Sequence, residues 1–176
     1  MPMEADTPAV EVSAEDFARV EESVRLAKPV SERSAQRYYH RIRASIQAYV
    51  GKKSHAAEKP AQYLLLVPDV FILLWRLTVD SRVSAANKAL LAGAIAYYIL
   101  PFDLLPEAIL GPIGYLDDLI VGVYTLNKVV ADTNPDILRE HWSGSEDVFG
   151  MLRRVLAAAD SLLGRDFLRK VKKIFK

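Results

Sequence analysis

Cysteine is absent from all 176 residues, which removes several classes of chemistry at once. No disulfide, thiolate metal site or cysteine nucleophile can form. Histidine is scarce, and His40, His55 and His141 stand in unrelated segments with no second histidine three or four positions away, so we expect no zinc site. The chain also lacks a Gly-x-Ser-x-Gly elbow, a phosphate-binding loop and a dinucleotide fingerprint. Nothing in these patterns indicates an enzyme, and no cofactor is expected from them.

Net charge is small as well. The formal charge is +1, while 51% of residues are hydrophobic and the mean hydropathy is +0.09. A length of 176 residues suits one domain with a substantial core. A composition this apolar, with so small a net charge, predicts that some apolar surface contacts a protein partner or a membrane.

Long hydrophobic runs are missing too. The longest uncharged run, 89–102, falls short of the roughly 20 residues that a transmembrane helix needs. Residues 1–12 contain three acids, no base and no apolar run, so they predict neither a secretory signal nor a transit peptide. We therefore expect a cytoplasmic protein. An integral hairpin stays as an alternative, because 89–116 holds only Asp103 and Glu107 as charges and these could be paired within a membrane.

Helical periodicity runs through the chain, and no strand alternation interrupts it. Residues 1–12 predict a disordered acidic lead, and Ser13 is positioned to cap a first helix that ends at Pro29. A second helix is expected from Ser31, with Tyr38, Ile42, Ile46 and Tyr49 on its apolar face. A linker follows over 51–59, so that 13–59 forms an N-terminal helical region.

A compositional change at Pro60 begins the central region, 60–131. Because proline disfavours helix in the preceding residue, we expect a break at Val67 and a new helix with Pro68 and Asp69 in its first turn. Arg76 and Asp80 are spaced as an i, i+4 ion pair within that helix.

Two apolar helices then face each other across an acidic bend. Ser84 is positioned to cap the first, which is apolar all round over 89–100, and Pro101 ends it. The second is expected from Gly114 or Tyr115 to about residue 131, with Gly122 allowing close approach of a neighbour. These patterns predict an all-α fold, a helical bundle around a central apolar helical hairpin.

The C-terminal region, 132–176, is expected to begin with a short helix. Asn134 and Pro135 predict its start and Trp142 its end, and Ser145 is positioned to cap a following helix from Glu146.

The bend carries a recognisable motif. An apolar helix ends in Tyr97-Tyr98-Ile99-Leu100-Pro101-Phe102-Asp103-Leu104-Leu105-Pro106-Glu107, and the next begins with Gly114-Tyr115-Leu116-Asp117-Asp118-Leu119. Over 63–131 the chain closely resembles the YkvA-like family, a bacterial domain of unknown function. Glu107 stands where that family usually has aspartate. The resemblance implies a family without implying an activity.

Asp103, Glu107, Asp117 and Asp118 form the one constellation with the composition of a metal site. Clustered carboxylates suit Mg²⁺ or Ca²⁺, so a divalent-metal enzyme or sensor is one hypothesis. Structural capping explains the same acids, because Asp103 can cap the turn at residue 104 and the aspartate pair lies where a helix dipole favours negative charge. We prefer the capping role.

Basic residues suggest two surfaces. Tyr38, Tyr39 and Tyr49 lie among the arginines of the second helix, a weak nucleic-acid signature that a solvated basic face explains equally, and a net charge of +1 argues against nucleic acid. From Arg165 onward, apolar and basic residues separate into the two faces of an amphipathic helix that could lie on an anionic membrane or pack on the bundle. The residues expected at the membrane surface are Phe167, Leu168, Lys170, Val171, Lys172, Lys173, Ile174 and Phe175.

The primary hypothesis is a non-enzymatic adaptor with a protein partner, resting on the inner face of the membrane. The metal-dependent protein and the integral hairpin are its rivals.

Overall fold

The computed structural model describes residues 30–52, 58–99 and 115–163, and throughout these ranges the ordered elements are α-helices with no strand. The predicted all-α class is therefore confirmed. The helices are α2 (Glu32–Lys52), α3 (Glu58–Leu64), α4 (Leu66–Val79), α5 (Ala85–Ile99), α7 (Tyr115–Val130), α8 (Pro135–His141) and α9 (Val148–Leu163). The expected N-terminal lead, first helix, acidic bend and basic C-terminal segment lie outside the described residues.

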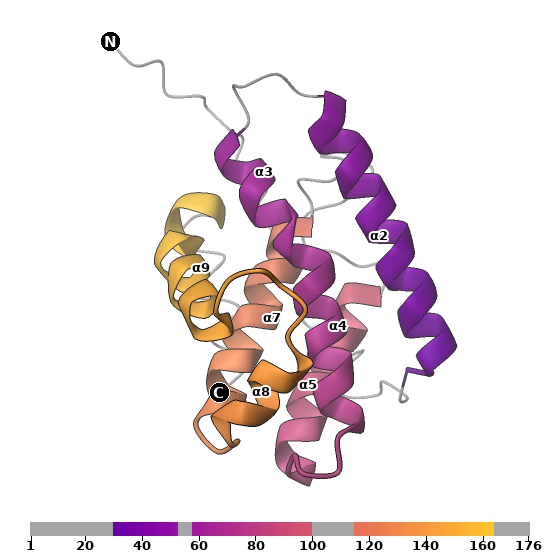
Figure 1. Cartoon of the computed structure of the whole chain (residues 1–176), viewed down its shortest axis with the longest axis vertical. Coiled ribbons are helices and arrows are strands. Elements are labelled where there is room, and N and C mark those ends of the chain that lie inside the picture. The colour runs from indigo at the N-terminus through magenta and orange to yellow at the C-terminus, as the bar shows by residue number, and fades with distance from the viewer. Residues whose placement is uncertain (1–29, 53–57, 100–114, 164–176) are drawn as a thin grey trace, which may run out of the picture.

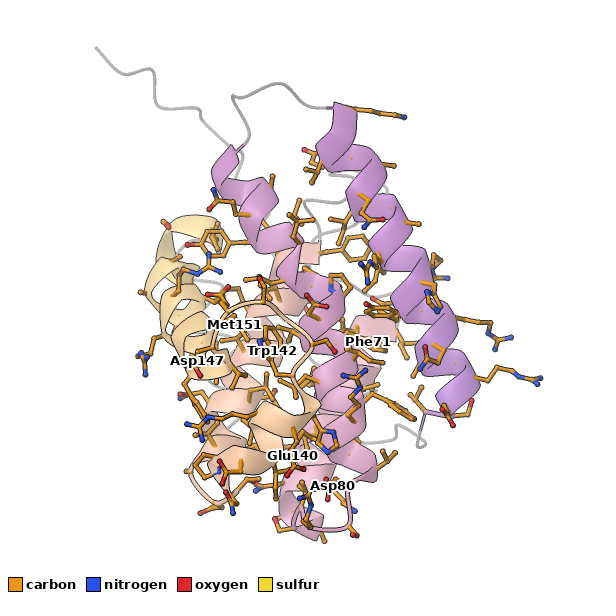
Figure 2. The ribbon with its side chains drawn as sticks, viewed as in Figure 1. Phe71, Asp80, Glu140, Trp142, Asp147 and Met151 are labelled. Carbon is orange, nitrogen blue, oxygen red and sulfur yellow. The ribbon has the colours of Figure 1, made fainter. Side chains whose placement is uncertain are left out.

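Helix α2 forms one edge of the bundle (Figure 1). It begins at Glu32, close to the predicted start at Ser31, and the Ser31 hydroxyl caps it by accepting a hydrogen bond from the Ser34 amide at 3.3 Å. The predicted apolar face is also correct, because Tyr38, Ile42 and Ile46 are buried. Tyr38 packs on Phe71 of α4 with ring centroids 4.6 Å apart, and Figure 2 shows Phe71 beside α2. This aromatic contact fastens the edge helix to the centre.

The junction between α3 and α4 lies at Leu65, so the predicted break at Val67 is wrong by two residues. Leu65 keeps helical angles, φ −63° and ψ −20°, and its amide still donates to the Ala61 carbonyl at 3.2 Å. Pro68 is tolerated because it falls in the first turn of α4, where amide groups need no partner within that helix.

Because α3 continues almost directly into α4, the two form a long helical stretch. The search for uncharged runs in the sequence did not reveal it, because this stretch contains charged residues. Ala61–Val79 is long and apolar enough, by length and composition, to cross a membrane, and 56% of its most apolar window is buried within the fold. A core helix of a soluble bundle passes the same test, so this stretch alone does not separate the two environments.

Helix α4 is the centre of the core, and it packs against α2, α5 and α7. It is apolar around most of its circumference, which is the pattern of an enclosed helix. Its buried side chains are Leu66, Val67, Pro68, Val70, Phe71, Ile72, Leu73, Leu74 and Leu77. Helices α5 and α7 pack on each other as well, so α4, α5 and α7 are mutually packed at the centre of the described core, to which α2 and α9 also contribute side chains.

Helix α7 approaches its neighbours most closely at Gly122. A Cβ atom there would lie 2.7 Å from the Tyr98 hydroxyl of α5 and 2.8 Å from Cγ1 of Val70 in α4. Carbon atoms do not approach so closely without displacement, so only glycine fits this three-helix contact. The close approach expected at Gly122 is confirmed.

The starts of the C-terminal helices agree with the sequence predictions in part. Helix α8 begins at Pro135 as predicted, and Asn134 caps it by accepting from the Asp136 amide at 2.9 Å. The predicted cap at Ser145 is wrong, because α9 begins at Val148 and the Asp147 carboxylate accepts from the Gly150 amide at 2.9 Å. The indole of Trp142 donates to the Glu146 carbonyl at 2.7 Å, which holds the intervening loop out of the helix.

Replacing Gly122 with alanine should destabilise the fold by about 1–3 kcal/mol, because the new methyl group overpacks the contact with Tyr98 and Val70. Gly150→Ala is the matched control, since its Cβ would meet nothing nearer than 3.7 Å and helical alanine gains up to about 1 kcal/mol. Urea unfolding of both variants measures the difference. Equal stability of the two variants would contradict the close approach.

Candidate functional site

Asp117 and Asp118 lie side by side in the first turn of α7, and both are completely buried. The sequence correctly predicted their place at a helix start. The sequence did not predict that both side chains are buried. Transfer of a carboxylate from water to a protein interior is strongly unfavourable unless polar groups compensate it. Two consecutive buried acids therefore mark the most constrained polar site in the described part of the chain.

Two consecutive tyrosines at the C-terminal end of α5 meet this pair. The Tyr97 hydroxyl donates a hydrogen bond to Oδ2 of Asp117 at 2.9 Å. Tyr98 is 2% exposed, and its hydroxyl has no hydrogen-bond partner among the described residues. Burial raises the pKa of Tyr98 well above its ordinary value, and the charges of Asp118 and then Asp117 raise it further. The phenol of Tyr98 therefore remains neutral, and Tyr97 donates to Asp117.

The chain positions these groups through the ends of two packed helices. Tyr97 and Tyr98 occupy the last turn of α5, and the Tyr98 carbonyl accepts a hydrogen bond from the Tyr38 hydroxyl of α2 at 2.6 Å. The aspartates occupy the first turn of α7, where the helix dipole favours negative charge. The site thus joins α2, α5 and α7 by polar contacts beneath an apolar core.

Chemically, the described site offers carboxylate oxygens and phenol hydroxyls. Such a set can accept hydrogen bonds, hold a proton or contribute oxygen ligands to a hard cation. Asp103 and Glu107, the other predicted members, lie outside the described residues. Within the described ranges, no group of three or more histidine, cysteine or acidic side chains is arranged to hold a metal ion.

Sequence reasoning did not assign roles to Tyr97 and Tyr98. A signal was present, because Tyr97 is the tyrosine of the Tyr-x-x-x-Pro element that precedes the acidic bend. Periodicity cannot show that its hydroxyl reaches Asp117, since the two residues belong to different helices.

A second polar cluster joins the α4–α5 turn to α8. Arg82 donates to Oδ2 of Asp80 at 2.7 Å and to Oε2 of Glu140 at 2.7 Å, and Nε2 of His141 lies 2.7 Å from Asp80 Oδ2. Figure 2 shows Asp80 and Glu140 at the same end of the bundle. The cluster therefore links residues about 60 positions apart.

The predicted ion pair between Arg76 and Asp80 is wrong. Asp80 ends α4 in an extended conformation, φ −73° and ψ 124°, and its carboxylate bonds to Arg82 and His141 instead. Arg76 donates to the His141 carbonyl at 2.8 Å and to the Ser143 hydroxyl at 2.5 Å. The i, i+4 rule fails here because the helix ends at the second member of the pair.

Arg82 and His141 hold the pKa of Asp80 well below its usual range through side-chain hydrogen bonds, and Arg82 also lowers the pKa of Glu140. A carboxyl whose pKa is lower in the folded state stabilises the fold above its unfolded pKa, roughly 3.9 for aspartate. That stabilisation is lost as the pH falls through the folded value.

Asp80→Asn should lower the stability of the fold at pH 7 and weaken the dependence of that stability on pH below about pH 4. The reason is that the Asp80 carboxylate takes up a proton in acid, whereas an asparagine side chain does not. Denaturant midpoints of wild type and variant, measured between pH 7 and pH 2, give the comparison. Asp136→Asn is the control, since Asp136 pairs with Arg139 at the exposed surface. A constant difference between wild type and Asp80→Asn at every pH would contradict the assignment.

Comparison with known proteins shows that the site lies in a segment shared with a described protein family, but that family has no assigned activity. Residues 87–124 match the family model described as Protein of unknown function (DUF1232), and this segment contains Asp117, Asp118 and both tyrosines. The Uncharacterized protein ORF9 of Methanothermobacter thermautotrophicus is 29% identical over 86 residues, which is 49% of this chain and 59% of that protein. The chain thus spans little more than half of that relative's length. No solved structure matches.

These matches support the coarser expectation, a segment related to a domain of unknown function. The narrower YkvA-like resemblance remains a prediction.

Proposed function

We propose that this chain is a non-enzymatic interaction module that rests on the inner face of a membrane through its C-terminal segment. The observation that carries the proposal is the separation of residue types from Arg165 to Lys176. Five apolar residues can share one helical face, while six basic residues and a single acid, Asp166, fill the remainder. Basic amphipathic segments of this composition bind the headgroup layer of anionic membranes.

The buried acidic pair supports a structural part in that module. Asp117 and Asp118 are closed off from solvent, and the identified partner of Asp117 is the hydroxyl of Tyr97. Carboxylates enclosed in this way suit the fastening of α5 to α7 better than turnover of a substrate. The acidic bend between these helices would then be the surface offered to a protein partner.

The full chain should bind vesicles that contain anionic lipid and not vesicles of neutral lipid alone, with binding that weakens as salt rises. A variant truncated after Gly164 removes the basic amphipathic segment and should lose most of this binding. Co-sedimentation at two ionic strengths measures both effects. Equal binding by the truncated variant would exclude the C-terminal segment as the anchor.

One observation supports an integral membrane protein instead. The stretch Ala61–Val79 is long and apolar enough to cross a membrane, but it lies outside the hairpin at 89–116 that the sequence indicated. Extraction of cell membranes with alkaline carbonate separates the alternatives. Release of the protein supports surface association, whereas retention in the pellet supports integration.

A divalent-cation site is a second candidate function, favoured by the adjacent buried carboxylates of Asp117 and Asp118. Asp103 and Glu107 would complete an oxygen-rich set for Mg²⁺ or Ca²⁺. In this candidate the module would sense the cation, because a ligand that binds the folded state alone raises its stability.

A cation site predicts that millimolar Ca²⁺ or Mg²⁺ raises the melting temperature of the wild type, and that Asp117→Asn and Asp118→Asn abolish this rise. Thermal melts with chelator and with metal provide the test, and Asp132→Asn, an exposed acid after α7, is the control. Wild-type melts that metal does not change would remove this second candidate and leave the structural role of the pair.

A further inference from the structure

The outward face of α2 concentrates positive charge. Arg33, Arg37 and Arg41 recur every four residues along it, and His40 lies beside them, all with exposed side chains. Four-residue spacing places successive side chains on the same side of a helix. Glu32 is the sole acidic residue of α2, so its exposed face carries a nearly unopposed row of arginines. We call Arg33, Arg37 and Arg41 the α2 arginine face.

These arginines differ from others in the described structure by lacking carboxylate partners. Arg82, Arg139 and Arg154 each form an ion pair with an acid. Within the described ranges, none of the three arginines of the α2 arginine face does so. Their recorded contacts are to neutral groups, so their charges remain available to an outside partner.

The contacts of the face hold its side chains without neutralising them. Arg37 donates to the Ser34 hydroxyl at 3.4 Å. The guanidinium of Arg41 lies 5.2 Å from the ring centroid of Tyr38. Such contacts restrict the side chains and preserve their positive charge.

We propose that the α2 arginine face is a docking surface for the anionic headgroups of a lipid bilayer. It spans about 12 Å from Arg33 to Arg41 at the rise of an α-helix, and α2 lies at the edge of the bundle (Figure 1). Arginine binds phosphate groups through several donors at once. A headgroup layer supplies phosphates at this density without requiring a particular register.

The aromatic residues favour lipid over single-stranded nucleic acid. Base stacking needs exposed rings beside the basic side chains. Tyr38 is 6% exposed and its hydroxyl is bonded to the Tyr98 carbonyl, while Tyr39 and Tyr49 are partly buried and pack against the core. The interleaving of tyrosine and arginine that suggested nucleic acid in the sequence therefore supplies a core anchor, not a stacking platform.

This inference rests on the membrane association proposed above, but it assigns binding to a different part of the chain. The exposed positions of α2 are polar or alanine, so the face has no large apolar side chain to insert. Attraction through α2 should be electrostatic and steeply salt-dependent, whereas insertion of phenylalanines from the C-terminal segment should persist better in salt.

The test compares full-length variants that lose the same charge in different places. Arg33→Gln, Arg37→Gln and Arg41→Gln together remove three charges from α2. Lys88→Gln, Lys128→Gln and Arg153→Gln remove three charges from other helices. Since each basic residue near an anionic surface contributes about fivefold, the α2 variant should bind phosphatidylserine-containing vesicles on the order of 100-fold more weakly, with the control variant close to wild type.

Equal binding by the α2 variant and wild type, or equal loss in both variants, would overturn the inference and leave the proposed membrane association intact. If truncation after Gly164 has no effect while the α2 variant loses binding, the inference stands and the C-terminal anchor fails. Loss of single-stranded RNA binding in an α2 variant that retains vesicle binding would assign the face to nucleic acid instead.

The absence of cysteine allows a direct second measurement. A single thiol introduced by Ala44→Cys on the exposed side of α2, or by Ala157→Cys on α9, can carry a polarity-sensitive fluorophore. On adding anionic vesicles, the probe at position 44 should become shielded from a neutral aqueous quencher and the probe at position 157 should not. Shielding at 157 alone, or equal shielding at both positions, would contradict docking through α2.

Discussion

The contact of α7 with α4 and α5 at Gly122 is the constraint on which the described core depends. It brings the backbone of one helix against side chains of two others, Val70 and Tyr98, and so sets how closely the three can pack. The same approach places the first turn of α7 beside the last turn of α5, where Tyr97 reaches Asp117. A wider separation would leave this buried carboxylate without its phenol donor.

Tyrosine hydroxyls are the means by which this apolar core accommodates polar atoms. Tyr38 bonds to a carbonyl at the end of α5, and Tyr97 bonds to a carboxylate at the start of α7, while both rings contribute apolar area to the core. A phenol can satisfy a buried acceptor without introducing a second charge. The cluster at Asp80 uses the opposite strategy, with arginine at the surface providing the donors.

Much of the fold could be predicted from local patterns, because helix starts and apolar faces are properties of neighbouring residues. Ser31, Asn134 and Gly122 behave as their sequence context indicates. Errors occurred where contacts between distant segments decide the outcome. The cap of α9 moved to Asp147 because Trp142 holds the preceding loop, and Asp80 turned from Arg76 toward Arg82 and His141. At the candidate site, the position of the aspartates was predictable, but their enclosure and tyrosine contacts depend on packing between helices.

The cluster that joins Arg82 to Glu140 has a consequence for the order of folding. These partners are 58 residues apart in the chain, and Asp80 and His141 are separated by 61. A ribosome therefore releases the turn between α4 and α5 well before the residues that pair with it. Closure of a loop this long costs chain entropy before any contact can offset it. In nascent chains that end before α8, the central helices should therefore fold without the contacts of Asp80 and Arg82 to α8. These contacts should form only after α8 has emerged from the ribosome.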